Sequence, residues 1–251
     1  MNLSDIQKVI DVFSPFGGWT SKLPIEGVVS GEADLFRDER IRWFLDRVNL
    51  CHRNVLELGP LECGHTYMLA QAGAASIWAV EQNPVAYLKG LVVHELLKGE
   101  LKFDDPETGW MNLICGDFFD FLADFPWPLR VVVASGVLYH QRQPALLIAA
   151  IAKKCKETLF VWTHYYDADH PRAGEFTPVA CGFCDFTYTG YELPYKTEHH
   201  IGGPEATAVW MSRPGLFACL EHFGFQITET NFDEPNHPNG PAIALIARRI
   251  S

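Results

Sequence analysis

The sequence predicts an α/β fold whose core is a seven-stranded, mostly parallel sheet with helices on both faces. Five short apolar runs, at 54–58, 76–80, 110–115, 130–135 and 158–163, alternate with segments of helical periodicity, as in βαβ units. Such runs are typical of strands that are buried on both faces. Two further strands, 225–230 and 242–249, are joined by the turn-rich stretch NFDEPNHPNGP, which suits an antiparallel pair.

Helical segments separate these strands along the chain. Apolar residues recur at helical spacing over 34–48, which predicts a helix before the first strand. Pro84 and Gly99 mark the start and end of a helix over 83–99, as proline and glycine commonly do. Further helices are expected over 4–13, with Ser4 as N-cap, and over 65–73, 117–124, 143–155 and 213–225.

A chain of 251 residues suits a single domain with an insertion. Residues 14–34 are rich in Gly, Pro and Ser, so we expect irregular structure there and assign 1–33 as an N-terminal cover segment; a tether at the sheet edge is the alternative. Residues 164–209 hold many aromatic and His side chains without a clear period. A loop of this length is usually functional, and we expect a lid or ligand-binding insertion.

Composition and charge disfavour several classes of protein. The formal net charge is −11, so a broad nucleic-acid surface is not expected. No apolar run reaches the roughly 18 residues that span a bilayer, and the N-terminus carries acids rather than a signal peptide. We therefore expect a cytoplasmic protein. The seven cysteines are scattered, which favours reduced thiols over a disulfide framework.

The first strand leads into a loop that resembles a nucleotide-binding turn. In NVLELGPLECGHTY, Gly59 and Gly64 have the spacing of the outer glycines of G-x-G-x-x-G, and Leu61 replaces the middle one. Glu81 ends the second strand, 22 residues after Gly59, where an acid commonly accepts hydrogen bonds from ribose hydroxyls. A solvated acid at a strand end is the plainer reading of Glu81.

Leu61 helps to distinguish two candidate cofactors. In dinucleotide enzymes the middle glycine lets the backbone approach the pyrophosphate, whereas S-adenosylmethionine (SAM) has no pyrophosphate. Glu57 would repel a phosphate but is able to engage the amino group of a methionine. After the third strand, Asp117 is placed to hydrogen-bond an adenine amino group, or alternatively to cap a helix, and Phe118 is placed against the ring.

These motifs together resemble those of class I SAM-dependent methyltransferases. The stretches ELGPLECGHT, VEQNP, GDFFDF and SGVLYHQRQP occur in that order. GVLYH-x-R-x-P is similar to the group that includes the tRNA wobble-uridine carboxymethyltransferase, and WTHYYD and HHIGGPEATAVW are similar to its uncharacterised small-molecule relatives. The resemblance implies a Rossmann-like fold and a SAM site. The residues expected in that site are Glu57, Gly59, Pro60, Gly64, His65, Glu81, Gln82, Asp117, Phe118, Ser135 and Gly136.

Candidate catalytic residues follow the fourth and fifth strands. Tyr139 and His140 come after the fourth strand, and His164 and Tyr165 come at the end of the fifth, while His200 lies in the 164–209 insertion. If the acceptor loses a proton, a base must reach it, and we rank His140 first, followed by His164 and His200. No metal is required.

The pair Cys181 and Cys184 is half of a possible zinc site. The sequence has no second C-x-x-C and no H-x₃₋₅-H to complete the site, and structural zinc normally needs four ligands. Two ordinary reduced thiols are therefore the preferred reading.

The sequence thus predicts a SAM-dependent methyltransferase that acts on O or N of a small or medium polar metabolite. One alternative keeps the fold but transfers a SAM-derived group to tRNA. Another is a nicotinamide-dependent oxidoreductase. The sequence does not define the acceptor or the oligomeric state.

Overall fold

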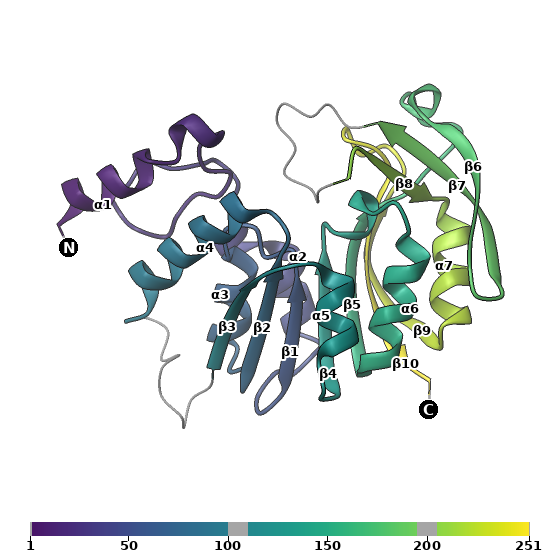
Figure 1. The fold of residues 1–251 in the computed structure, drawn as a ribbon, viewed down its shortest axis with the longest axis horizontal. Coiled ribbons are helices and arrows are strands. Elements are labelled where there is room, and N and C mark those ends of the chain that lie inside the picture. Colours follow the sequence, from purple (N-terminus) through teal and green to yellow (C-terminus); the bar gives the residue numbers. More distant parts are fainter. Residues whose placement is uncertain (1, 100–109, 195–204, 251) are drawn as a thin grey trace.

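The computed structural model describes residues 2–99, 110–194 and 205–250. Its central sheet has seven strands in the order β3-β2-β1-β4-β5-β10-β9 (Figure 1). The strands are β1 (Asn54–Leu58), β2 (Ser76–Glu81), β3 (Trp110–Cys115), β4 (Leu129–Ser135), β5 (Cys155–His164), β9 (Phe225–Glu234) and β10 (Ala242–Arg249). Strands β1 to β5 are parallel, and β10 pairs antiparallel with both β5 and β9. The predicted fold class is confirmed.

Helices cover both faces of this sheet. One apolar cluster joins the sheet to α5 (Phe118–Asp124), α6 (Pro144–Lys154) and α7 (Arg213–His222). The other joins it to α1 (Leu3–Asp11), α2 (Glu39–Leu45), α3 (Gly64–Gln71) and α4 (Pro84–Leu97). None of the helices in the described parts of the chain is long and apolar enough to cross a membrane.

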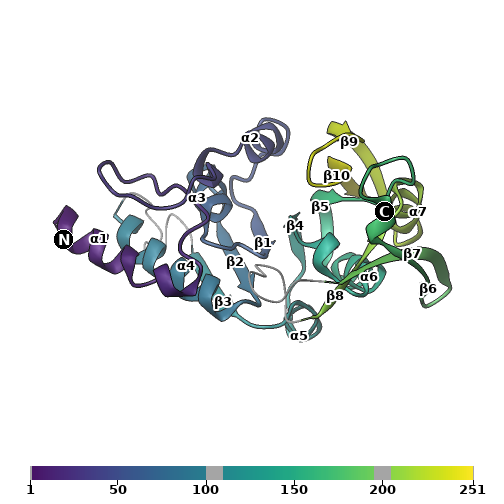
Figure 2. The same cartoon turned by 90° about the horizontal axis from the view of Figure 1, so that it is seen from above.

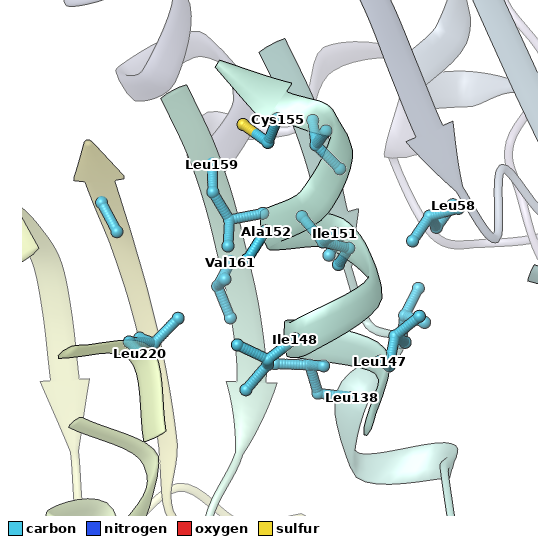
Figure 3. Close-up of a cluster of buried hydrophobic side chains, with 14 of the residues drawn as sticks. Leu58, Leu138, Leu147, Ile148, Ile151, Ala152, Cys155, Leu159, Val161 and Leu220 are labelled. Carbon is cyan, nitrogen blue, oxygen red and sulfur yellow. The ribbon is translucent and has the colours of Figure 1, made fainter. Parts of the chain in front are cut away.

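Helix α6 shows how the sequence produces this packing. Pro144 lies in its first turn, where the missing N–H has no helical partner to lose. Leu147, Ile148 and Ile151 are fully buried against β5 and neighbouring elements (Figure 3). Burying each such side chain contributes about 1.5–3 kcal/mol, so tertiary packing fixes the helix beside the end of β4.

The 164–209 insertion is more regular than the sequence indicated. Its described part contains a three-stranded antiparallel sheet of β6 (Thr177–Phe183), β7 (Phe186–Pro194) and β8 (Thr207–Met211), the last of which extends past residue 209. Along β6 and the first part of β7 the half-buried side chains alternate with exposed ones, and Phe183, Phe186 and Tyr188 pack against the main core. The expectation of irregular structure was wrong because Gly and Pro residues mask this two-residue period.

The N-terminal segment runs from α1 along one end of the molecule, and β6 to β8 lie at the other end (Figures 1 and 2). Asn2, rather than the expected Ser4, caps α1, because its side chain accepts a hydrogen bond from the Asp5 amide. The predicted helix over 34–48 divides at Asp38. A short 3-10 helix, η2 (Leu35–Arg37), precedes that residue, and Asp38 then caps α2.

Candidate active site

A cavity of about 410 Å³ lies at the carboxyl ends of the parallel strands, the edge where open α/β sheets bind ligands. Its walls come from the loops after β1, β2 and β4, from the end of β5, from η2, and from the starts of α2, α3 and α5. Eight of the predicted cofactor residues line it: Gly59, Pro60, His65, Glu81, Gln82, Phe118, Ser135 and Gly136.

The loop after β1 has a tightly constrained backbone. Gly59 has a φ of +65°, and a Cβ atom built there would lie 3.0 Å from Val137 Cγ2. Leu61 and Cys63 also have positive φ, of +52° and +62°, although neither is glycine. The Leu61 amide donates a hydrogen bond of 2.9 Å to Glu81 Oε2. The loop therefore keeps the left-handed backbone of a glycine-rich loop, although two of its three left-handed positions, Leu61 and Cys63, are not glycine.

Glu81 is buried at the cavity wall. Its Oε2 accepts from the Leu61 amide, and its Oε1 accepts from the Asn83 amide at 2.8 Å. Burial raises the pKa of this carboxyl from 4.5 to about 7, and the nearby Glu57 carboxyl acts in the same direction, while hydrogen bonds from the backbone of Asn83, Leu61 and Gln82 oppose the rise. Each carboxylate oxygen has a second lone pair, so Glu81 is able to accept two further hydrogen bonds from a ligand.

Glu57 lies beneath the loop and is not among the residues that line the cavity. Its side chain is 1% exposed, Thr66 Oγ1 donates to its Oε2 at 2.6 Å, and its Oε1 has no hydrogen-bond partner within the described chain. Burial raises the pKa of this carboxyl. The structure thus places Glu57 beneath the loop, hydrogen-bonded to Thr66 on α3 and outside the residues that line the cavity.

Asp117 also lies outside the cavity lining and acts as the N-cap of α5. Its Oδ1 accepts from the amides of Phe119 and Asp120, and its Oδ2 accepts from Gln82 Nε2 at 2.6 Å. Gln82 lines the cavity, so the hydrogen bond to Asp117 fixes the orientation of the Gln82 amide at the cavity wall. The helix-cap reading of Asp117 fits this geometry.

Ser135 and Gly136 form the wall at the end of β4. Ser135 Oγ is buried without a hydrogen-bond partner in the described chain. Gly136 has a φ of +78°, and a Cβ built there would lie 3.1 Å from the Trp162 ring. Gly64, by contrast, does not reach the cavity. A Cβ at that position would lie 2.7 Å from the Leu35 backbone, so Gly64 permits close packing of α3 against η2.

A charged network borders the cavity on the α2 side. The Asp38 carboxylate accepts from Arg40 Nε at 2.8 Å and contacts His65 Nε2 at 2.9 Å. Hydrogen bonds from Arg40 and His65 outweigh the desolvation of this carboxyl and hold its pKa well below the ordinary value. The Arg40 guanidinium stacks 4.1 Å from the centroid of the Trp162 ring, which fixes a cation at the cavity wall.

A second cavity, of about 690 Å³, adjoins the first and shares Arg40, Tyr139 and Trp162 with it. Its other walls come from the end of β5, the start of the insertion, β7, β8 and the β9–β10 connection. The remaining lining residues are His164, Arg172, Glu175, Leu193, Pro194, Trp210, His237 and Asn239.

His164 has a defined tautomer in this second cavity. Its Nδ1 lies 2.9 Å from the Gly240 carbonyl oxygen and 3.2 Å from that of Pro241. A carbonyl only accepts, so Nδ1 carries the proton and Nε2 keeps its lone pair in the neutral ring. Burial lowers the pKa of His164 to about 4. The ring also stacks on Trp210, with centroids 5.1 Å apart and planes within 9°.

Two of the other predicted catalytic residues lie near His164, because the Tyr139 ring packs 4.7 Å from the His164 ring and lines both cavities. Tyr139 and His140 line the first cavity, and their rings pack 4.1 Å apart. Burial raises the pKa of Tyr139 to about 12. Tyr165 lines neither cavity; it lies in the core, where its hydroxyl donates to Asp233 at 2.8 Å. His200 lies outside the described residues.

Cys181 is half-buried on β6, and Cys184 is exposed in the β6–β7 turn with a φ of +53°. Within the described ranges no three side chains of His, Cys, Asp or Glu gather as a metal site would require.

The sequence reasoning missed several lining residues. Arg40 and Trp162 belong to segments that were identified only as a helix and a strand. Arg172 belongs to the 164–209 insertion, and Trp210 lies on β8, one residue beyond it. Trp162 was the easiest of these to predict from the sequence, because it lies near the end of the predicted fifth strand. Arg40 carried a weaker signal, an arginine two residues after an acid at a helix start.

The fold is shared with solved methyltransferase structures. The N-terminal domain of EvdMO1, solved in the presence of S-adenosylhomocysteine (SAH) and D-fucose, has a TM-score of 0.76 and 22% identity over 100% of this chain and 98% of that chain. Full-length EvdMO1 is longer, and this chain covers 48% of it. Magnesium protoporphyrin IX methyltransferase from Synechocystis PCC 6803, with bound SAH, has a TM-score of 0.57 and 16% identity over 85% and 81% of the two chains.

A third structure is 1,6-didemethyltoxoflavin-N1-methyltransferase from Burkholderia thailandensis, with bound 1,6-didemethyltoxoflavin and SAH. Its TM-score is 0.54 at 12% identity, over 87% of this chain and 79% of that one. No protein-family model and no curated protein matches the sequence. These likenesses show that the chain has the class I methyltransferase fold.

Proposed function

We propose that this protein is a SAM-dependent methyltransferase that acts on an oxygen or nitrogen of a small or medium polar metabolite. The observation that carries the proposal is the pair of adjoining cavities, which meet at Arg40, Tyr139 and Trp162. One cavity lies where this fold binds its cofactor, and the other supplies room for an acceptor. Their common wall is the place where a methyl group would cross between them.

The first cavity fits SAM in both size and chemistry. Its volume of about 410 Å³ is within the usual range for small-molecule sites. Glu81 would accept from the ribose hydroxyls, and Phe118 and Gln82 would hold the adenine. The unpartnered Ser135 Oγ and the Arg40 guanidinium would face the methionine end, where Arg40 suits a carboxylate.

When bound, SAM supplies a methyl group that its sulfonium already activates. The protein then has to align acceptor and methyl, exclude water and accept a proton where the acceptor carries one. His164 suits the last task, because its neutral Nε2 keeps a lone pair in the acceptor cavity. The pKa of about 4 keeps this nitrogen unprotonated at neutral pH but also makes it a weak base, so loss of the acceptor proton to His164 would accompany methyl transfer rather than precede it.

The chemistry of the second cavity supports a polar acceptor. Arg172, Glu175 and Asn239 offer hydrogen-bonding groups, while Trp162 and Trp210 offer aromatic surface. Arg172 and Glu175 form an ion pair at 2.8 Å, so this wall carries no excess charge. A neutral acceptor with several hydroxyl or amine groups is therefore favoured over a polyanion. This feature and the net charge of −11 also count against the tRNA alternative.

The proposal is tested by thermal unfolding of protein from which carried-over ligand has been removed. A ligand present at about 100 times its Kd adds about 2.7 kcal/mol of stability, which for a chain of this size raises Tm by roughly 5–10 °C. We expect SAH to produce this rise and NADH to leave Tm unchanged. A rise with NADH and none with SAH would instead support the oxidoreductase alternative.

A further inference from the structure

The centre of the cofactor loop is held in an unfavourable backbone conformation. Leu61 and Cys63 both have left-handed φ values, and this conformation costs a residue with a Cβ on the order of 1 kcal/mol or more. Only Leu61 of the two lines the cofactor cavity. Interactions elsewhere must therefore stabilise the loop, and the residue between these two, Glu62, makes such interactions.

Glu62 is 0% exposed and is fully engaged by the N-terminal segment and α4. The Thr20 amide donates to Glu62 Oε1 at 2.9 Å, and the Ser21 amide donates to Oε2 at 2.6 Å. Lys89 Nζ lies 3.1 Å from Oε1. One carboxylate thus joins the cofactor loop to a backbone segment about 40 residues earlier in the chain.

Lys89 completes this connection from α4. Its side chain is 8% exposed, and its ammonium also donates to the Gly18 carbonyl and lies 5.7 Å from the centroid of the Trp19 ring. A buried lysine and a buried glutamate are each costly to desolvate, and removing one partner leaves the other uncompensated. The arrangement therefore holds only while residues 18–21 remain docked against the loop.

We propose that Glu62 and Lys89 are positioning residues for the cofactor, and that together with residues 18–21 they form a brace that presets the loop. The proposal rests on the SAM function proposed above. With the brace docked, the Leu61 amide stays on Glu81 and the loop keeps its binding shape. By linkage, a cofactor that binds the braced loop stabilises the docking of residues 18–21 by the same free energy.

The substitution Lys89→Met tests the brace, because it removes the ammonium while it keeps an apolar stem of similar length. We expect SAH to bind this variant about tenfold more weakly than wild type in calorimetry at matched pH and salt. The matched control is Lys98→Met at the C-cap of the same helix, which removes an exposed pair with Glu95. SAH affinity in the control should stay within twofold of wild type.

Hydrogen exchange in the unmutated protein provides a second measurement that does not depend on the folding of a variant. The Thr20 and Ser21 amides donate to Glu62, so SAH should slow their exchange although neither residue lines the cofactor cavity. Without SAH these two amides should exchange faster than the globally protected amides of β1, so that slowing by SAH reports local undocking rather than the general stabilisation that any ligand of the folded state provides.

Each outcome has a defined meaning. Weaker SAH binding by Lys89→Met, together with slowed exchange at residues 20 and 21, supports the brace. Unchanged affinity in a folded Lys89→Met variant, or unchanged exchange, overturns the brace and leaves the methyltransferase proposal intact. If Lys89→Met does not fold, the exchange result decides. If SAH does not bind wild type, the proposed function and the brace both fail.

Discussion

Replacing Glu81 with glutamine should separate cofactor binding from folding. The carboxylate accepts one backbone amide at each oxygen, from Leu61 and Asn83, and we expect its remaining lone pairs to accept the ribose hydroxyls. Glutamine keeps the shape of the side chain but offers only one acceptor oxygen. Its NH₂ group would also face one of the two backbone N–H groups, and two donors do not hydrogen-bond to each other. The variant would therefore lose one backbone hydrogen bond from Leu61 or Asn83 as well as one hydrogen bond to the ligand.

The size of the effect follows from this count of hydrogen bonds. A hydrogen bond to a charged group contributes about 1.5–3 kcal/mol. Losing one such bond to the ribose therefore costs about 2 kcal/mol, which corresponds to a roughly 30-fold increase in the Kd for SAH. The buried carboxyl has a pKa of about 7, so it is only partly charged at neutral pH. Glutamine removes the cost of burying that charge, which offsets the lost backbone hydrogen bond. We therefore expect the folded variant to be about as stable as wild type.

Calorimetric titration of SAH into Glu81→Gln and wild type at pH 8 measures this difference directly. Glu95→Gln on the exposed face of α4 is the matched control, because it changes the same chemical group far from the cavity lining. The reasoning would be refuted if Glu81→Gln bound SAH as tightly as wild type while its Tm was unchanged. An equal loss of affinity in Glu95→Gln would show a nonspecific effect of charge.

Five further predictions follow from the structure. SAH binding should favour ionised Glu81, so affinity should rise about tenfold from pH 6 to pH 8, a dependence that calorimetry should find absent in Glu81→Gln. The raised folded pKa means that the folded state binds the extra proton, so this group's contribution to stability should fall as pH rises from about 4.5 through 7, seen as a falling urea midpoint. His164→Ala should lower kcat about 100-fold for a hydroxyl acceptor without changing the Kd for SAH, and unchanged turnover would exclude His164 as the base. Gly64→Ala, whose Cβ would meet Leu35 at 2.7 Å, should cost about 1–3 kcal/mol; Phe160→Ala, in a fully buried position, should cost about 3–5 kcal/mol, and both are checked by urea denaturation.

The sheet was predictable because local sequence and tertiary burial agree along each strand. The runs NVLEL and WMNLIC form β1 and β3 over the predicted residues, since an apolar run bounded by turn residues has few other stable arrangements. The strand-end positions of Gly59 and Glu81 could be predicted from the sequence for the same reason. Once strand order is given, residues after parallel strands converge on one edge of the sheet.

The second cavity was not predictable in the same way. It combines Arg172 from the insertion with His237 from the β9–β10 connection, and no local period links such distant positions. Glu57 illustrates a different difficulty. Its place at the end of β1 suggested ligand contact, but side chains alternate between the two faces of a strand. Both faces of β1 are buried, and the Glu57 side chain lies on the face covered by α3, where it meets Thr66.

The central claim is tested most directly by a crystal structure of the protein with SAH bound. We predict the ribose hydroxyls on Glu81, the adenine beside Phe118 and Gln82, and the sulfur directed toward Tyr139 at the junction of the two cavities. SAH bound elsewhere, or bound with its sulfur turned away from that junction, would contradict the account.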